Sequence, residues 1–190
     1  TLQGPASNDA VARETFLGIM QSQAARMNRI LDDLLSLSRI EMREHVPPSE
    51  TIDLGSILRG TVDGLEPLAR GARITLRYEP PTGTLRVRGD RDELVQVFQN
   101  LIQNAIKYGR ENGNAEVALS SFPGGAGQPE KYVVRVIDDG PGIADEHLPR
   151  LTERFYRVDT ATSRERGGTG LGLAIVKHIV NRHRGGFLVE

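Results

Sequence analysis

Apolar residues in the first quarter of the chain recur every three or four positions, which is the spacing of one face of an α-helix. The stripe consists of Phe16, Met20, Met27, Ile30, Leu34 and Leu37, with the polar Gln23 as an exception, and Leu31, Leu35 and Ile40 widen it. A helix over 10–42 would be about 50 Å long, at ~1.5 Å per residue. We expect a partner helix or second chain along this stripe, with a helix lying across its own domain as the alternative.

The pattern changes after a linker, Val46-Pro47-Pro48-Ser49. Helices are predicted over 54–68, 90–108, 146–156 and 170–184, and strands near 51–53, 73–78, 85–89, 115–122 and 131–138, with a further strand starting at 187. Asp90 is placed to cap the second of these helices. The segment 123–127 is predicted to be a loop, and 158–168 a polar lid. Strands in two groups with helices between them favour an α+β fold over a doubly wound parallel sheet.

Composition narrows the class of protein. The formal net charge of −1 gives no electrostatic reason to expect binding to nucleic acid or to an anionic membrane. The absence of cysteine excludes disulfides and thiolate metal sites. No run of apolar residues approaches the ~18 needed to span a bilayer, and the first residues do not resemble a signal peptide.

The helix predicted over 90–108 carries an unusual polar row. At about 100° per residue, Asn100, Lys107 and Asn104 fall near ~40°, ~20° and ~80° from Gln96, opposite the apolar side. Amide oxygens are neutral ligands that suit Mg²⁺, and a lysine can neutralise phosphate. A polar helix face with amides bonded to backbone is the alternative reading.

Two glycine-rich segments follow. Asp138-Asp139-Gly140-Pro141-Gly142-Ile143 comes at the end of a predicted buried strand, where a carboxylate can accept a hydrogen bond from the amino group of adenine, while glycines let a flat base approach the backbone. Gly168-Thr169-Gly170-Leu171-Gly172-Leu173 opens an apolar helix, whose free N–H groups suit phosphate. An ordinary strand-end turn and a flexible helix cap are the alternatives. The second run does not match a P-loop or a dinucleotide fingerprint.

The ordered set 100–108, 138–143, Arg154-Phe155-Tyr156-Arg157 and 168–173 resembles the catalytic ATP-binding domain of sensor histidine kinases, one branch of the Bergerat-fold ATPases. The resemblance implies an α/β sandwich over 47–190, trimmed at its C-terminus, and the end of a dimerisation and phosphotransfer hairpin over 1–46. It also implies ATP and Mg²⁺ as cofactors, a response regulator as partner and a homodimer formed by the hairpin. The parent protein would be a bacterial inner-membrane receptor with this part in the cytoplasm.

The resemblance assigns roles to individual residues. Asn104 would hold Mg²⁺ with Asn100 beside it, and Lys107 and Tyr108 would meet phosphate or ribose. Asp138 would recognise the adenine base, and Gly140, Gly142 and Ile143 would belong to the same cofactor-binding set. Arg157 would stabilise the γ-phosphate, with help from Arg164 or Arg166 in the lid. The cofactor-binding set is completed by the glycine segment, that is, Gly168, Thr169, Gly170, Leu171, Gly172 and Leu173.

The sequence departs from the family at the phosphoacceptor. None of the four histidines, His45, His147, His178 and His183, is followed by an acidic residue and then a proline, as the family acceptor is. Thr1-Leu2-Gln3-Gly4-Pro5 looks like the tail of a preceding helix and its turn. We therefore expect a fragment that binds Mg-ATP without phosphorylating itself.

Two other functions compete with phosphotransfer. An ATP-driven machine of the topoisomerase, chaperone or mismatch-repair type would carry a glutamate general base four residues before the Mg²⁺-binding asparagine. That position is Asn100, an amide that cannot accept a proton from water. A non-catalytic dimer scaffold is the third reading, and the intact pocket residues argue against it.

Overall fold

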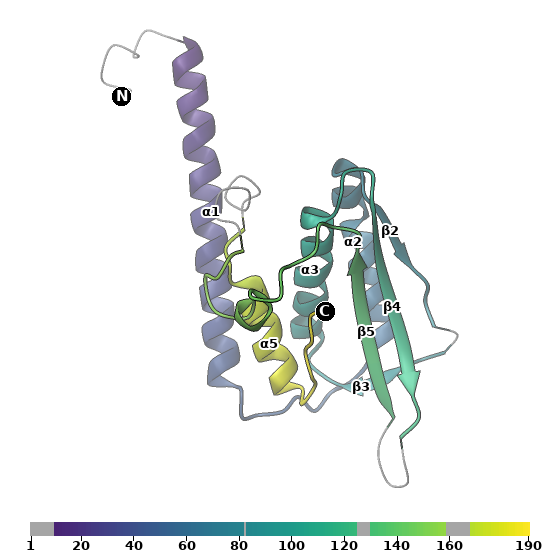
Figure 1. Cartoon of the computed structure of the whole chain (residues 1–190). Coiled ribbons are helices and arrows are strands. Elements are labelled where there is room, and N and C mark those ends of the chain that lie inside the picture. The colour runs from purple at the N-terminus through teal and green to yellow at the C-terminus, as the bar shows by residue number, and fades with distance from the viewer. Residues whose placement is uncertain (1–9, 82, 125–129, 159–167) are drawn as a thin grey trace.

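The computed structural model describes residues 10–81, 83–124, 130–158 and 168–190. Its first element, α1 (Ala10–Met42), has the bounds predicted from the apolar stripe. Figure 1 shows this helix projecting well beyond the rest of the molecule. Leu37 and Ile40 near its C-terminal end are buried, and this end packs against α5 (Gly172–Arg182). Met20 and Met27, further toward the N-terminus, stay exposed, whereas Phe16 is half-buried.

A three-stranded mixed sheet is the centre of the remaining fold. Its order is β2 (Thr75–Tyr78), β4 (Asn114–Phe122) and β5 (Lys131–Asp138). β2 runs parallel to β4, with Thr75 opposite Asn114, whereas β5 pairs antiparallel to β4. A separate antiparallel pair joins β1 (Thr51–Asp53) to β3 (Arg86–Arg88).

Helices cover one face of this sheet, as Figure 1 shows. They are α2 (Leu54–Gly71) and α3 (Arg91–Tyr108), with α5 packed on the far side of α3. Between the layers lies one apolar core, whose fully buried members include Ile57, Leu58, Ile102, Val117, Ile175 and Ile179. The predicted α+β sandwich with a mixed sheet is therefore confirmed.

Two aspartates fix where the covering helices begin. Oδ1 of Asp53 accepts a hydrogen bond of 3.2 Å from the Gly55 N–H at the start of α2. Oδ1 of Asp90 accepts from the N–H groups of Asp92 and Glu93, so it caps α3 as the sequence predicts. Both caps satisfy N–H groups that the first turn of a helix leaves unpaired.

Three element predictions need correction. The segment 146–156 contains turns and one short 3₁₀ helix, Leu148–Arg150, rather than an α-helix. Residues 187–190 pair with no strand in the described part of the chain. The strand that ends at Asp138 is at the sheet edge rather than buried, since Ile137 is 50% exposed. The predicted loop and lid fall largely on 125–129 and 159–167, outside the described residues.

Candidate functional site

The polar row of α3 forms one wall of the site. Gln96, Asn100, Asn104 and Lys107 are all half-buried. Nδ2 of Asn100 donates a 3.0 Å hydrogen bond to the Gln96 carbonyl, so its Oδ1 is turned away from that carbonyl. A Cβ placed on Gly172 would lie 2.8 Å from this Oδ1. The row on α3 and the glycine segment therefore face each other directly.

The turn after β5 forms a second wall. Asp138 is exposed, and its Oδ1 accepts a 2.9 Å hydrogen bond from the Gly140 N–H. A Cβ on Gly140 would lie 2.5 Å from that oxygen and 2.8 Å from the carbonyl oxygen of Tyr108. Glycine is thus required where the turn meets the end of α3. Gly142 has a φ of +77°, and Ile143 is 41% exposed beyond it.

Asp139 holds this turn against the neighbouring strand. Its Oδ2 accepts a 2.8 Å hydrogen bond from the backbone N–H of Asn114, and this bond is the main reason why the pKa of Asp139 is lowered. A Cβ on Gly113 would lie 2.3 Å from Oδ1 of the same carboxylate. The two adjacent aspartates therefore differ: Asp139 is a structural anchor, whereas Asp138 faces solvent.

The glycine segment is tied to the segment that carries Arg157. The N–H of Phe155 donates a 2.8 Å hydrogen bond to the Gly170 carbonyl. Gly170 has a φ of +75°, and its Cβ would lie 2.9 Å from the Phe155 backbone, so only glycine fits. Phe155 itself has a φ of +63°. Leu171 is fully buried and Leu173 half-buried, and together they anchor the start of α5.

Two cationic side chains meet at Gly168. A Cβ at this position would lie 2.8 Å from Nζ of Lys107, 3.4 Å from the Tyr108 hydroxyl and 3.8 Å from Nη2 of Arg157. Nε and Nη2 of Arg157 are buried and have no hydrogen-bond partner among the residues that the structure describes. Burial lowers the pKa of Lys107, which the Arg157 charge lowers further, while Tyr108 opposes both. Buried donors next to a desolvated ammonium are a fitting environment for a polyanion.

Helix α1 also contributes to the site, which the sequence patterns had not predicted. Oγ1 of Thr169 donates a 2.7 Å hydrogen bond to Oδ2 of Asp33, and Oγ of Ser36 donates to Oε1 of Gln96. Glu41 forms a salt bridge with Arg154. The sequence does indicate that these α1 residues point the same way. Asp33, Ser36 and Ile40 are spaced by three and four residues and therefore share one helix face.

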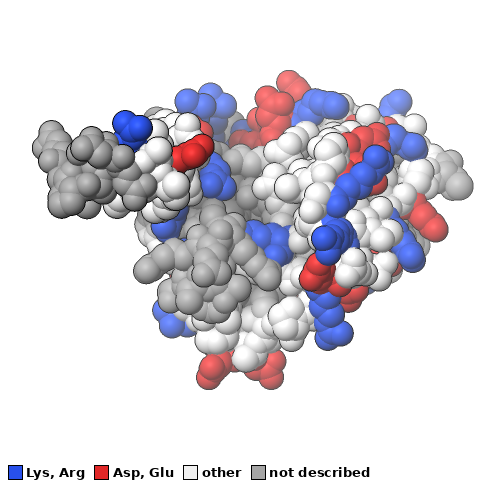
Figure 2. Space-filling view, turned by 90° about the horizontal axis from the view of Figure 1, so that it is seen from above, with Lys and Arg blue, Asp and Glu red and all other residues white. Residues whose placement is uncertain are grey.

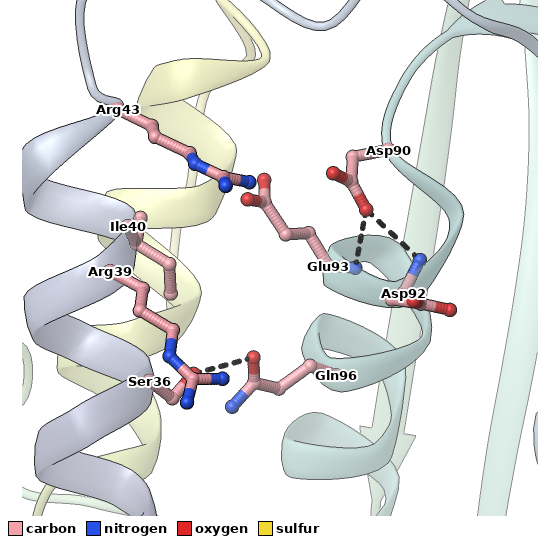
Figure 3. Close-up of a pocket in the computed structure, with 8 residues that line it drawn as sticks. All are labelled: Ser36, Arg39, Ile40, Arg43, Asp90, Asp92, Glu93 and Gln96. Carbon is pink, nitrogen blue, oxygen red and sulfur yellow. Dashed lines mark hydrogen bonds between the residues drawn. The ribbon is translucent and has the colours of Figure 1, made fainter.

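A cavity of about 230 Å³ lies between α1 and the start of α3. Figure 3 shows Arg43 pointing across it toward Glu93, and Ser36 bonded to Gln96 at its other end. Its lining places Arg39 of α1 and Arg43, just after that helix, opposite Asp92 and Glu93 of α3 and the capping Asp90, so the charges on the two sides are complementary. It lies at the opposite end of α3 from Lys107 and is separate from the candidate phosphate site.

The structure thus brings Asn100 to Gly172, Lys107 and Tyr108 to Gly168, and Arg157 to the same point. Asn104 shares the α3 row, and Asp138 lies on the turn beyond it. Arg164 and Arg166, the predicted lid cations, fall outside the described residues.

The chain is similar to known histidine kinases in sequence and in fold. The chain is 40% identical over 177 residues to the sensor-like histidine kinase SenX3 of Mycolicibacterium smegmatis, an alignment that covers 93% of this chain and 44% of SenX3. The mycobacterial sensor histidine kinase MprB superposes with a TM-score of 0.62 at 27% identity, covering 75% of this chain and 85% of MprB. Histidine kinase ThkA, solved in complex with the response regulator TrrA, gives a TM-score of 0.63 at 24% identity, covering 83% of this chain and 45% of that one.

The chain spans less than half the length of the curated relatives that it matches. Over residues 89–190 it matches the family described as histidine kinase-, DNA gyrase B- and HSP90-like ATPases. This region contains the α3 row, the Asp138 turn and the glycine segment. The chain therefore belongs to that ATP-binding family, and its relatives place it in the sensor histidine kinase branch.

Proposed function

We propose that the chain is the catalytic part of a protein-histidine kinase of a two-component system, which transfers the γ-phosphoryl group of Mg-ATP to a histidine and then to a response-regulator aspartate. The observation that carries this proposal is the Arg157 guanidinium near Lys107 at Gly168, whose buried Nε and Nη2 have no hydrogen-bond partner within the described part of the chain. Burying cationic donors without partners is costly, unless an anion binds them during function.

Each part of the nucleotide has a matching group. Asp138 keeps one oxygen of its exposed carboxylate for the amino group of adenine, while Gly140 and Gly142 leave room for the base. The glycine segment supplies N–H groups at the start of α5 for phosphates.

We assign Mg²⁺ to Asn104, with Asn100 beside it. No group of three or more acidic, histidine or cysteine side chains able to hold a metal lies among the described residues. The ion would therefore depend on neutral amide oxygens, phosphate oxygens and water, a donor set that suits magnesium. Bound Mg²⁺ would offset charge on the transferring phosphoryl group.

The chain's own residues act by position and charge. Lys107 and Arg157 would hold the terminal phosphate and stabilise the charge that spreads over its oxygens during transfer. A Tyr108 hydroxyl at the same point adds a neutral hydrogen-bond donor. A hydrolytic ATPase of this fold would need a general base that takes a proton from the attacking water. Asn100 occupies that position, and because its amide cannot accept this proton, transfer is favoured over hydrolysis.

We place the acceptor histidine on another segment. His183 is held in the fold, because its Nε2 accepts from the Asp90 N–H and its Nδ1 lies 2.8 Å from the Ile179 carbonyl. His147 Nδ1 lies 2.7 Å from the Tyr156 hydroxyl, and His178 lies near Glu41. His45 is exposed on the turn after α1.

The exposed face of α1 supports a dimer through a helical hairpin in the parent protein. Met20, Met27, Leu31 and Leu35 are each more than half exposed, an arrangement that suits a bundle with a partner helix. A division into a hairpin part over 1–46 and a catalytic part over 47–190 follows from this proposal. A response regulator is the partner because ThkA was solved with one.

A cytoplasmic position beneath a bacterial inner membrane is part of the same proposal. In the described part of the chain, no helix has both the length and the apolar character needed for a membrane span.

Titration with ATP, with and without Mg²⁺, tests the binding part of this function. We expect saturable Mg²⁺-dependent binding that Asp138→Ala abolishes, together with negligible steady ATP turnover. Incubation with γ-labelled ATP and a separately expressed helical hairpin of the parent protein that carries the acceptor histidine tests transfer, and we expect acid-labile label on that hairpin and none on this chain. Steady turnover would favour the ATP-driven machine, and absence of Mg²⁺-dependent binding would favour the dimer scaffold.

A further inference from the structure

Tyr156 lies between two residues that shape the phosphate side of the candidate site. Before it, the Phe155 N–H donates to the Gly170 carbonyl. After it, Nη2 of Arg157 lies 3.8 Å from where a Cβ on Gly168 would be. Figure 2 looks onto the end of the molecule at which α3 finishes, and shows Lys and Arg atoms along the hollow beside α1. Tyr156 itself is half-buried, so its position depends on what its side chain contacts.

The Tyr156 hydroxyl is bonded to His147. Its oxygen lies 2.7 Å from Nδ1 of the imidazole, and the bond can form with either tautomer, because a hydroxyl both donates and accepts. His147 is itself held in place, since its backbone N–H donates to the Ala144 carbonyl and its Nε2 lies 3.6 Å from Glu146. Ala144 directly follows the turn 138–143, which forms the adenine side of the site. The bond therefore connects the adenine side to the phosphate side.

Two further contacts fix Tyr156. The Arg150 guanidinium lies over the face of the tyrosine ring, 4.2 Å from its centroid, which is within the range of a cation–π interaction. Arg150 also forms a 3.2 Å salt bridge with Glu153, whose carbonyl accepts a hydrogen bond from the Tyr156 N–H. Leu151, in the same segment, is buried. Tyr156 is thus held at its hydroxyl, at its ring face and at its backbone.

An anchored Tyr156 limits where Arg157 can lie. Consecutive Cα atoms are about 3.8 Å apart, so fixing one residue fixes the point at which the next side chain begins. Nε and Nη2 of Arg157 have no hydrogen-bond partner within the ranges that the structure describes, so no bond from these nitrogens to a described residue holds the guanidinium. We propose that Tyr156, through its bond to His147, is a positioning residue that keeps the Arg157 guanidinium where the terminal phosphates of ATP bind. This inference rests on the proposed nucleotide-binding function and adds Tyr156 and His147 to it.

A positioning residue acts only through the group that it positions. Loss of the Tyr156 hydroxyl should therefore weaken the binding of ligands that reach Arg157 and leave other ligands unaffected. ATP carries the terminal phosphates and AMP lacks them, whereas a general loss of structure would weaken both ligands alike. In a chain without the Arg157 guanidinium, the Tyr156 hydroxyl should make no further difference, because the two residues act as a unit.

Calorimetric titration of the whole chain with Mg-ATP and with AMP tests this role. Tyr156→Phe removes the hydroxyl and keeps the ring under Arg150. We expect it to raise the Kd for ATP about fivefold, equal to roughly 1 kcal/mol, and the Kd for AMP less than about twofold. His147→Ala removes the other partner of the same bond, so its effect should be similar, and the double variant should bind ATP no more weakly than either single one.

Tyr132→Phe is the matched control. The Tyr132 hydroxyl also makes one side-chain hydrogen bond, of 2.9 Å to Glu130, but it belongs to the opposite end of β5 from Asp138, about 20 Å away at ~3.4 Å per residue. Its loss should change neither Kd. Arg157→Met provides a second background, in which adding Tyr156→Phe should leave the Kd for ATP where Arg157→Met alone places it.

Several outcomes would overturn the positioning role. They are an unchanged Kd for ATP in Tyr156→Phe, equal losses for ATP and AMP, or a further loss when Tyr156→Phe is added to Arg157→Met. A loss with Tyr156→Phe but not with His147→Ala would also overturn it, because the hydroxyl would then act on the nucleotide directly. All of these results leave ATP binding by the unaltered chain intact. If the unaltered chain bound no Mg-ATP, the proposed function itself would fail and this inference with it, so the two failures are distinguishable.

Discussion

The hydroxyl of Thr169 donates a 2.7 Å hydrogen bond to Oδ2 of Asp33 and so joins residues 136 positions apart. The same Oγ1 accepts a 3.2 Å hydrogen bond from the Leu171 N–H, which belongs to the turn before α5. One side chain therefore connects the glycine segment to the long helix and shapes its own loop. Any ligand that shifts this loop must also affect the contact with α1.

Thr169→Val should loosen this contact. Valine keeps the shape but removes the hydroxyl, leaving the half-buried Asp33 carboxylate without its partner at a cost of about 1.4 kcal/mol. We expect the amides around Leu37 and Ile40, buried where α1 docks, to exchange with solvent about tenfold faster. Thr169→Ser keeps the hydroxyl and serves as control, and unchanged exchange in the valine variant would show that the bond does not hold α1.

Arg182→Met should destabilise the fold strongly. Arg182 is 7% exposed, and its Nη1 lies 2.5 Å from Oε2 of Glu93, while its Nε donates to the Arg43 carbonyl. Removing the cation leaves the Glu93 carboxylate, whose side chain is 14% exposed, without its ion-pair partner, at a cost of about 3 kcal/mol in the free energy of unfolding. Adding Glu93→Gln should recover part of the loss.

Chemical denaturation measures this effect. The matched control is Arg70→Met, which breaks an exposed pair with Glu66. An exposed pair contributes less than about 1 kcal/mol, so the control should unfold almost as the unaltered chain does. Equal effects of the two substitutions would contradict a buried role for Arg182.

Gly170→Ala should damage nucleotide binding. Its φ of +75° is strained for alanine, and the added Cβ would lie 2.9 Å from the Phe155 backbone. Relief of the clash moves the segment that carries Arg157, so we expect the Kd for Mg-ATP to rise about tenfold, or roughly 1.4 kcal/mol. Gly60→Ala is the control: it lies within α2 with open space around it, and alanine there should stabilise the fold by about 0.5–1 kcal/mol without changing the Kd.

Affinity for ATP should fall as pH rises through the alkaline range. Burial, with the Arg157 charge, lowers the pKa of Lys107 below its usual 10.5. A bound polyanion favours the protonated amine and raises that pKa, so affinity is greatest below the pKa of the free protein and decreases above it. The decline should therefore begin at lower pH than for an ordinary lysine. Titrations in a pH series measure it, and Lys107→Arg should flatten the profile; an unchanged profile would exclude Lys107 as the titrating group.

Local patterns predicted the elements that local chemistry determines. The apolar spacing of 10–42 and the cap at Asp90 gave helix bounds that α1 and α3 confirm. The prediction of a helix over 146–156 was wrong. Pro149 lies within the segment and is disfavoured inside an α-helix, so only one 3₁₀ turn, Leu148–Arg150, forms there. At the other end, Phe155 adopts a φ of +63° where its N–H bonds to the Gly170 carbonyl, a tertiary contact that no spacing within the segment reveals.

The candidate site, too, was predictable only where residue types and local spacing determine it. The residue types on α3 and in the glycine runs indicated a nucleotide site, and the structure brings Lys107, Arg157 and Gly168 together. The pairing of Asp33 with Thr169 was not predictable, because it depends on how α1 packs on α5. The apolar stripe indicated only the exposed face of α1. The contacts of this helix with the site are made by its polar residues.

The most direct test of the central claim, that Arg157 and Lys107 form the phosphate-binding part of an ATP site, is calorimetric titration of Arg157→Met with Mg-ATP and with AMP. Methionine keeps an unbranched apolar stem but removes the guanidinium, whose Nε and Nη2 are buried without a partner in the described ranges. We predict a loss of ATP affinity of about tenfold or more, equal to ~1.4 kcal/mol, with AMP affinity unchanged. Unaltered binding of ATP by this variant would contradict the account.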